Sequence, residues 1–140
     1  MSLLRLSRLA RVSQVRRLAV TETGLQSPFE NDADFEHKCD EVLQQLFTYL
    51  DDDVRDNGKF DCDFGGGVLE VQCDTAGWVI NKQTPNHQIW LASPLSGPQR
   101  FEYFNGRWRN HRDHEKLLQE LLEEEMSQHL GFDVEFEEPF

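Results

Sequence analysis

The chain has 140 residues, 38% of them hydrophobic and 11% aromatic, which is enough to bury one core and too little for two. Its 14 Lys and Arg stand against 26 Asp and Glu, a net charge of −12, and this sign excludes nucleic acid and anionic membranes as partners. No apolar run approaches the roughly 20 residues that span a bilayer, so no transmembrane segment is expected.

Residues 1–20 differ in charge from the rest of the chain. They hold five arginines, three serines and no acid, and without those arginines nine basic residues face 26 acidic ones, a net charge of −17. An arginine-rich, acid-free N-terminus is typical of a mitochondrial transit peptide. We predict a transit peptide over residues 1–20, a disordered linker over 21–33, a folded domain over 34–140 and a location in the mitochondrial matrix. A basic arm folded onto the acidic body is the alternative.

Two segments have the apolar spacing of helices. The first is residues 34–54, where Asp32 or Asp34 is placed to cap the first turn. The second is residues 113–130, capped by Asp113 and ended by a glycine.

Short alternating segments separated by turn residues lie between the two helices and predict strands. Asn105-Gly106 is the strongest hairpin signal in the chain. The predicted strands are residues 59–64, 67–73, 77–81, 88–93, 99–104 and 107–109. The element order predicts an α+β two-layer sandwich, with two helices packed on one face of an antiparallel sheet of about five to six strands and the other face open.

Two features near the C-terminus concern packing. Glu125 and His129 are four residues apart in the second helix, which predicts a hydrogen bond at the helix end, with a proton-linked pair as the alternative. In the tail, Phe132, Val134 and Phe136 alternate with acids. We predict that these three side chains lie in the groove between the helices.

Trp90 is the candidate centre of a protein-binding surface. It lies between Ile89 and Leu91, so strand alternation sends it to the opposite face from them. With Ile89 and Leu91 toward the helices, Trp90 lies on the open face, where a large aromatic side chain is typical of a binding hot spot.

Three patterns that suggest other ligands do not meet the requirements of their sites. The glycine run at 65–67 has no following Lys-Ser/Thr, which favours a tight bend over a phosphate loop. Residues 53–64 lack the carboxylates that an EF-hand needs at its third and twelfth positions. Cys39, Cys62 and Cys73 form no zinc spacing, so we interpret them as small apolar fillers without a disulfide.

Carboxylates gather on one edge of the predicted fold. Asp40, Glu41, Asp51 and Asp52 lie on the polar arc of the first helix, and alternation places Asp61 and Asp63 together on the adjoining strand. Lys38 is the one basic residue between positions 21 and 54. Oxygen ligands of this kind favour Fe²⁺, Fe³⁺, Mn²⁺ or Mg²⁺, bound loosely and partly hydrated. A solvated polar face is the alternative.

Residues 79–100, VINKQTPNHQIWLASPLSGPQR, resemble the frataxin family, and the similarity extends from about Phe35 to Leu130. The resemblance implies the frataxin fold, mitochondrial residence and a role in iron–sulfur cluster biogenesis. It also implies weak iron binding on an acidic ridge and docking of the sheet face on the cysteine desulfurase–scaffold complex. Some acids of the family are replaced here by Gln44, Gln45 and Thr48.

Carried over by position, the resemblance gives two sets of site residues. The acidic ridge consists of Glu36, Asp40, Glu41, Asp51, Asp52, Asp61 and Asp63. The partner-binding residues are Asn81, Gln83, Trp90, Arg100 and Trp108.

We therefore expect an iron-binding accessory protein that activates the desulfurase complex and supplies Fe²⁺, without catalytic residues of its own. The alternative is a ferroxidase that oxidises and stores iron. A ferroxidase centre usually uses inward-facing Glu and Glu-x-x-His on bundle helices, which this sequence lacks. A monomer is expected, with iron-dependent oligomers as the alternative.

Overall fold

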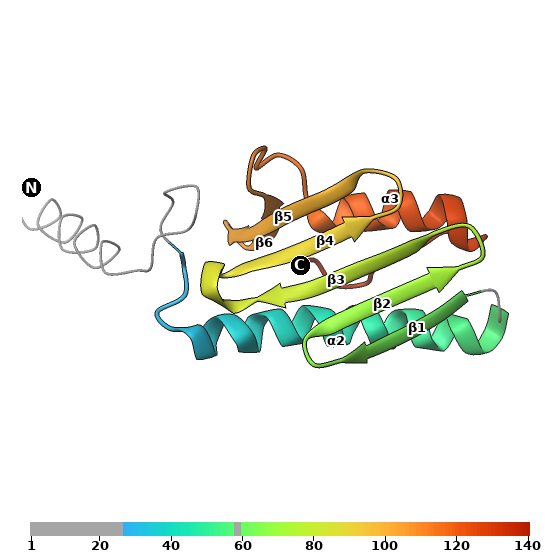
Figure 1. Cartoon of the computed structure of the whole chain (residues 1–140), viewed down its shortest axis with the longest axis horizontal. Helices are drawn as coiled ribbons and strands as arrows, with labels where there is room; N and C mark the ends of the chain where they lie inside the picture. Colours follow the sequence, from blue (N-terminus) through green and yellow to red (C-terminus); the bar gives the residue numbers. More distant parts are fainter. Residues whose placement is uncertain (1–26, 58–59) are drawn as a thin grey trace, which may run out of the picture.

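A computed structural model describes residues 27–57 and 60–140 (Figure 1). The predicted transit peptide and residues 21–26 of the predicted linker lie outside these residues. The helices are α2 (Asp32–Asn57) and α3 (Leu118–Leu130), with a short 3-10 turn η1 (Thr84–Asn86). The strands are β1 (Phe60–Gly65), β2 (Val68–Cys73), β3 (Gly77–Gln83), β4 (Gln88–Ser93), β5 (Gly97–Phe104) and β6 (Arg107–Asn110).

The six strands form one antiparallel sheet in the order of the sequence. Both α2 and α3 lie behind this sheet, and no described helix covers its other face (Figure 1). The predicted α+β two-layer sandwich is confirmed. None of the helices in the described part of the chain is long and apolar enough to cross a membrane.

Helix α2 is longer than predicted and is capped by a different residue. The Asp34 backbone N–H donates to Asn31 Oδ1 at 2.9 Å, and Asn31 Nδ2 donates to Asp34 Oδ2 at 3.1 Å. This reciprocal pair satisfies an N–H that has no partner within the helix. Asn31 is therefore the cap, in place of the predicted Asp32 or Asp34.

Residues just before α2, assigned to a linker from the sequence, are part of the folded domain. Phe29 is 8% exposed, and its ring packs on the ring of Phe35 in α2 with centroids 5.6 Å apart. Ser27 is buried, and its Oγ lies 2.8 Å from His87 Nδ1, while His87 Nε2 lies 2.8 Å from Asp32 Oδ1. Contacts between residues far apart in sequence fix this segment, and composition does not show them.

The glycine run makes the β1–β2 turn. Gly65 pairs with Val68, and the two residues between them, Gly66 and Gly67, have φ of +60° and +76°. A two-residue hairpin turn with positive φ at both positions matches the twist of the strands, and glycine adopts it without steric cost. The predicted tight bend is confirmed.

Helix α3 begins five residues later than predicted. Asn110 Oδ1 accepts the backbone N–H groups of Arg112 and Asp113, at 2.9 and 3.2 Å, and holds residues 110–113 in a turn. Leu117 then forms an antiparallel bridge with Arg109, in an extended conformation with φ −94° and ψ 137°. The helix can start only after this bridge. Its predicted stop is confirmed, since Gly131 has φ +85°.

Glu125 does not pair with His129. Its carboxylate is 5% exposed and accepts hydrogen bonds from Trp78 Nε1 at 3.0 Å, Ser93 Oγ at 2.6 Å and Ser96 Oγ at 2.5 Å. These three donors satisfy the buried oxygens and tie α3 to β3 and to the β4–β5 turn. Helical spacing alone suggested the wrong partner.

The C-terminal tail packs between the helices as predicted for Val134 and Phe136, whereas Phe132 is half-buried and stacks on Phe60 of β1, with ring centroids 6.0 Å apart. Val134 and Phe136 are each 4% exposed. The Phe136 ring packs on Tyr49 of α2 at 5.0 Å, and the Val134 backbone N–H donates to Ser127 Oγ of α3 at 2.8 Å. The tail thus contacts both helices.

The cysteines behave as the predicted apolar fillers. All three are free thiols, and Cys39 and Cys73 are buried. Burial raises the pKa of the Cys39 thiol to about 12, with a further contribution from Asp40. Burial also raises the pKa of Cys62 to about 12, with smaller contributions from Asp51 and Asp63.

Candidate docking face and acidic ridge

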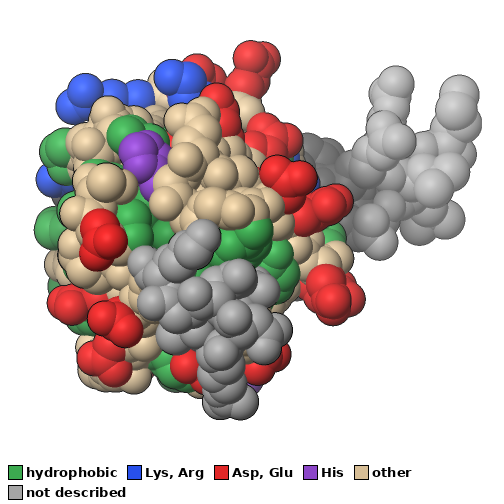
Figure 2. Space-filling view, turned by 90° about the vertical axis from the view of Figure 1, so that its right-hand side faces the viewer, with side chains coloured by type: hydrophobic (Ala, Val, Ile, Leu, Met, Phe, Trp, Pro, Cys, Tyr) green, Lys and Arg blue, Asp and Glu red, His purple; other side chains and the backbone are tan. Residues whose placement is uncertain are grey.

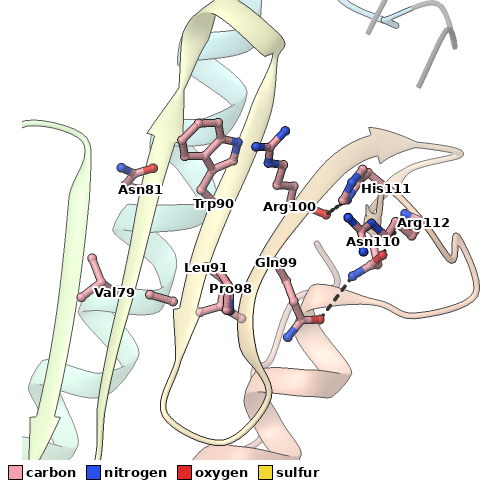
Figure 3. Close-up of a pocket in the computed structure, with 11 residues that line it drawn as sticks. Val79, Asn81, Trp90, Leu91, Pro98, Gln99, Arg100, Asn110, His111 and Arg112 are labelled. Atoms are coloured by element: carbon pink, nitrogen blue, oxygen red, sulfur yellow. Dashed lines mark hydrogen bonds between the residues drawn. The ribbon is translucent and has the colours of Figure 1, made fainter. Parts of the chain in front are cut away.

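Asn81, Trp90 and Arg100 lie in one row across three neighbouring strands. Asn81 of β3 is directly opposite Trp90 of β4, and Trp90 is directly opposite Arg100 of β5. Ile89 and Leu91, on either side of Trp90, are 0% and 2% exposed, whereas Trp90 itself is only half-buried. Strand alternation therefore places the row on the open face, as the sequence predicted (Figure 3).

The row is held in position by its own contacts. The Arg100 guanidinium carbon lies 4.8 Å from the centre of the Trp90 ring, a cation–π distance. Trp90 Nε1 donates to Gln88 Oε1 at 3.0 Å. Gln88 is fully buried and stands opposite Gln83, the fourth predicted contact residue, which is half-buried at the end of β3. The aromatic anchor is thus fixed before any partner arrives.

A shallow groove of about 690 Å³ follows this row. We call it the open-face groove. Its lining residues are Val79, Asn81, Trp90, Leu91, Ala92, Pro98, Gln99, Arg100, Asn110, His111 and Arg112. Val79 is one of the exposed large hydrophobic residues, at 39%. An aromatic and aliphatic floor with a few polar groups at its rim has the chemistry of a protein-binding surface.

Trp108 is not part of this face, which corrects its assignment as a partner contact. Its side chain is 0% exposed and packs against three aromatic rings. The distances between ring centroids are 6.4 Å to Phe29, 6.1 Å to Phe35 and 5.4 Å to Tyr103. Trp108 pairs with Tyr103, which shares the helix-covered face with Phe101. The Asn105-Gly106 turn fixes the register in which Trp108 pairs with Tyr103, and this register would have predicted that Trp108 faces the helices.

The α2 part of the acidic ridge is engaged with neighbouring side chains. Asp40 Oδ1 accepts a hydrogen bond from Lys82 Nζ at 2.9 Å, and this bond raises the pKa of Lys82. Glu36 Oε1 accepts from Thr84 Oγ1 at 3.0 Å. On the surface of α2, Glu41 lies 3.3 Å from His37 Nε2 and 3.2 Å from Lys38 Nζ.

The remaining ridge acids are spread over the end of α2 and the edge strand β1. Asp61 and Asp63 are exposed on β1, and Asp52 is exposed on α2. Asp51 and Asp63 both contribute to the raised pKa of Cys62 on β1. Within the described residues, no three acidic, histidine or cysteine side chains come together as a ready metal site. Figure 2 shows acidic side chains in separate groups at the top, right and lower left of one face, with Lys and Arg at its upper left edge.

Lys82, His111 and Arg112 are among the residues of these two surfaces that the sequence reasoning did not name. Lys82, which pairs with Asp40, follows Asn81 in the strand, and alternation alone directs it to the helix side. His111 and Arg112 reach the groove because the Asn110 turn folds them against β5, where the His111 backbone N–H donates to the Arg100 carbonyl at 2.9 Å. A helix predicted from residue 113 gave no reason to place them there.

Comparisons with known proteins agree on one family. A family model described as a frataxin-like domain matches residues 29–132. The chain is 38% identical over 108 residues to the mitochondrial frataxin homolog of Saccharomyces cerevisiae, covering 75% of this chain and 60% of that protein. It is 42% identical over 93 residues to mitochondrial frataxin of Arabidopsis thaliana, covering 64% of this chain and 48% of that protein. The match thus spans roughly half to three fifths of these two relatives.

A bacterial protein and two solved structures are similar as well. The iron–sulfur cluster assembly protein CyaY of Neisseria meningitidis is 36% identical over 97 residues, covering 68% of this chain and 89% of that protein. A yeast frataxin structure has a TM-score of 0.62 and 34% identity, covering 81% of this chain and 91% of the other. A trimeric frataxin from S. cerevisiae complexed with ferrous iron has a TM-score of 0.59 and 38% identity, and the match covers 64% of this chain and 82% of the other.

Proposed function

The chain belongs to the frataxin family, and from this premise we propose that it is an iron-binding accessory protein of iron–sulfur cluster assembly. In this proposal it binds the cysteine desulfurase–scaffold complex through the open face and increases desulfurase turnover. The proposal of cluster assembly is supported by the bacterial relative CyaY, which is named as an iron–sulfur cluster assembly protein. The chain is mitochondrial, because its frataxin relatives from yeast, plant and fly are named as mitochondrial proteins. We propose the matrix as the compartment and residues 1–20 as the transit peptide.

The observation that carries the docking proposal is the row formed by Asn81, Trp90 and Arg100. A fixed aromatic ring, stacked by an arginine and flanked by an amide, has the composition of an interface hot spot. The row lies on the sheet face that neither α2 nor α3 covers (Figure 1). A partner can therefore bind it without opening the core.

Weak iron binding is proposed for the acidic ridge. Carboxylate oxygens suit Fe²⁺ and Fe³⁺, and a ridge spread along α2 and β1 fits hydrated, exchangeable ions better than a resident metal centre. The yeast frataxin structure that is complexed with ferrous iron supports iron as the cation. In this view iron is cargo for the assembly complex.

Desulfurase turnover, measured with the purified cysteine desulfurase–scaffold complex, tests the proposal. Wild-type protein should stimulate turnover, and Trp90→Ala should lose most of the stimulation because a central aromatic anchor contributes about 2 kcal/mol or more. Val68→Ala, a half-buried position on the same face outside the groove, is the matched control. Equal stimulation by wild type and Trp90→Ala would remove the open face as the docking site. Oxygen consumption with added Fe²⁺, in the isolated protein, would instead favour the ferroxidase alternative.

A further inference from the structure

Residues 27–31, which lead into α2, form a segment that we call the N-terminal strap. The strap lies beside the turn between β3 and β4 (Figure 1), and a side-chain contact joins it to the end of that turn. Ser27 is 1% exposed and Phe29 8%, whereas Glu30 and Asn31 are exposed. The strap therefore packs against the domain through alternate side chains.

Phe29 packs against aromatic rings from separate parts of the chain. The distances between ring centroids are 5.6 Å to Phe35, 5.8 Å to His87, 5.6 Å to Tyr103 and 6.4 Å to Trp108. Phe35 belongs to α2, Tyr103 to β5 and Trp108 to β6. Phe29 therefore closes one end of the core, and loss of the strap would open these rings to water at a cost in hydrophobic burial.

A chain of hydrogen bonds holds the strap closed. The Phe29 backbone N–H donates to Ser27 Oγ at 3.2 Å. Ser27 Oγ lies 2.8 Å from His87 Nδ1, and His87 Nε2 lies 2.8 Å from Asp32 Oδ1. A neutral His87 with its hydrogen on Nε2 satisfies all of them, because the serine hydroxyl then donates to Nδ1 and Nε2 donates to the carboxylate. We call Ser27, His87 and Asp32 the His87 latch.

His87 is itself held by its backbone and by a stacking partner. It ends η1 in the left-handed conformation, with φ 50° and ψ 46°, and its backbone N–H donates to the Thr84 carbonyl at 3.0 Å. Its ring stacks on Phe35, with centroids 4.9 Å apart and an interplanar angle of 12°. Turning the ring away from Ser27 and Asp32 would break this stacking, so the latch has one preferred geometry.

The same three residue types form the catalytic triad of serine hydrolases, but the arrangement here differs from a triad. In a triad the serine pairs with Nε2 of the histidine and the carboxylate with Nδ1. In the His87 latch these two positions are exchanged. Ser27 is also 1% exposed, so its hydroxyl is closed to a substrate. The geometry suits the fastening of a chain segment and not nucleophilic attack.

We propose that the His87 latch fixes the N-terminus of the processed protein, because the closed strap prevents peptidases from trimming the chain beyond Ser27. A peptidase needs the residues around the cleaved bond to be free of the fold, and burial and hydrogen bonding withhold the strap from it. Hydrolysis of a peptide bond within residues 27–31 then requires the latch to open. The inference rests on the proposed transit peptide in one respect, that a leader is removed before the strap.

Chymotrypsin cleavage after Phe29 in the purified full chain, located by mass spectrometry, tests the latch. The rate of this cut follows the opening equilibrium of the strap when reclosing is fast. Ser27→Ala should accelerate the cut about two- to tenfold, the factor expected from one hydrogen bond. His87→Asn tolerates the left-handed backbone but is too short to bridge both partners, and should accelerate it as well. Cleavage after Phe101, which is 0% exposed, should stay as slow as in wild type.

Thr48→Ala is the matched control, because this hydroxyl bonds within α2 and should leave the Phe29 cut unchanged. Ser27→Ala combined with His87→Asn should accelerate the cut no more than His87→Asn alone, since both changes open one latch. Unchanged cleavage after Phe29 in both single variants would overturn the latch. Equal acceleration after Phe29 and Phe101 would overturn it too, because the strap would then open only with the whole domain.

Import of the full precursor into isolated mitochondria, with the N-terminus of the product read by mass spectrometry, separates this inference from the proposed function. The wild-type product should retain Ser27, and the Ser27→Ala and His87→Asn chains should give further products that begin after Phe29. A wild-type product that begins after Phe29, or identical products from all three chains, would overturn the proposal. If the precursor is not imported, the transit peptide is rejected and chymotrypsin cleavage alone decides the latch.

Discussion

The ammonium group of Lys82 lies 2.9 Å from a carboxylate oxygen of Asp40, and this pair links strand β3 to the acidic face of α2. A cation bound at Asp40 has to compete with Lys82 for the same oxygen. The contact raises the pKa of Lys82, so the competing charge is present throughout the physiological pH range.

Lys82→Met should therefore strengthen Fe²⁺ binding at the ridge, by about two- to fivefold at low salt. Lys116→Met removes the same charge far from Asp40 and is the control. Anaerobic Fe²⁺ titration followed by amide NMR gives both the affinity and the place. Equal gains in the two variants would show that net charge alone, and not Lys82, limits iron binding.

Trp90→Ala and Ile89→Ala should separate docking from folding. Ile89 is fully buried under the helices, and large-to-small changes at such positions cost about 2–5 kcal/mol. Trp90→Ala loses a cation–π contact and one hydrogen bond at a half-exposed site, so we expect a loss of about 1 kcal/mol or less. Urea unfolding of each variant measures the difference. If the two variants lose equal stability, Trp90 is a core residue and the face assignment is reversed.

Glu125→Ala should destabilise the fold by about 2–4 kcal/mol, because Trp78 Nε1 and two serine hydroxyls lose their buried acceptor. Glu125→Gln keeps an acceptor oxygen and should cost less. Glu124→Ala, an exposed neighbour on α3, should change the free energy of unfolding by about 0.5 kcal/mol or less. Denaturant unfolding at neutral pH compares all three. Equal effects at positions 124 and 125 would mean that the Glu125 network does not stabilise the fold.

Alkaline pH should destabilise the protein through its buried thiols. The folded-state pKa of Cys39 and Cys62 is about 12, against an ordinary value of 9.0. Between these values the unfolded chain has lost the thiol protons and the folded chain has kept them. The free energy of unfolding therefore falls as pH rises, by at most about 1.4 kcal/mol per pH unit for each thiol.

Unfolding of wild type and of Cys39→Ala between pH 8 and 10.5 tests this pH dependence. The variant should be less stable at pH 8 because of the cavity, yet its stability should fall less steeply with pH. Parallel pH profiles would show that the Cys39 thiol contributes nothing to the alkaline loss. The same comparison applies to Cys62→Ala.

Residues 1–20 should direct a fused reporter protein into mitochondria, because a basic, acid-free segment is what import requires. Replacing its five arginines with glutamine is the control and should leave the reporter in the cytosol. Fractionation of cells expressing the two fusions gives the answer. A wild-type fusion that remains cytosolic would contradict the transit peptide.

Features that depend on neighbours in sequence were predictable. Alternation along β4 placed Trp90 opposite to Ile89 and Leu91, and the glycine run and Asn105-Gly106 marked hairpin turns that the structure contains. The apolar spacing of the tail also predicted its position between the helices. In each case the pattern is local and the physical reason is the geometry of one element.

Features that depend on distant side chains were not predictable in the same way. The start of α3 depends on the Asn110 turn and on the bridge from Leu117 to Arg109. The partners of Glu125 come from positions 29 to 47 residues away. The segment at Ser27 is held by His87, 60 residues later. Helical or strand period carries no information about such contacts.

The order of the strands also constrains how the chain acquires its fold. Each strand pairs with its neighbour in sequence, so every hairpin closes a short loop at low entropic cost. The tail instead reaches α2 across 86 residues to Tyr49 and 93 residues to Gln45. A chain that emerges from its N-terminus can therefore pair its strands and pack α2 on them early, whereas the side of α2 that carries Tyr49 and Gln45 gains its contacts only when residues 132–140 arrive.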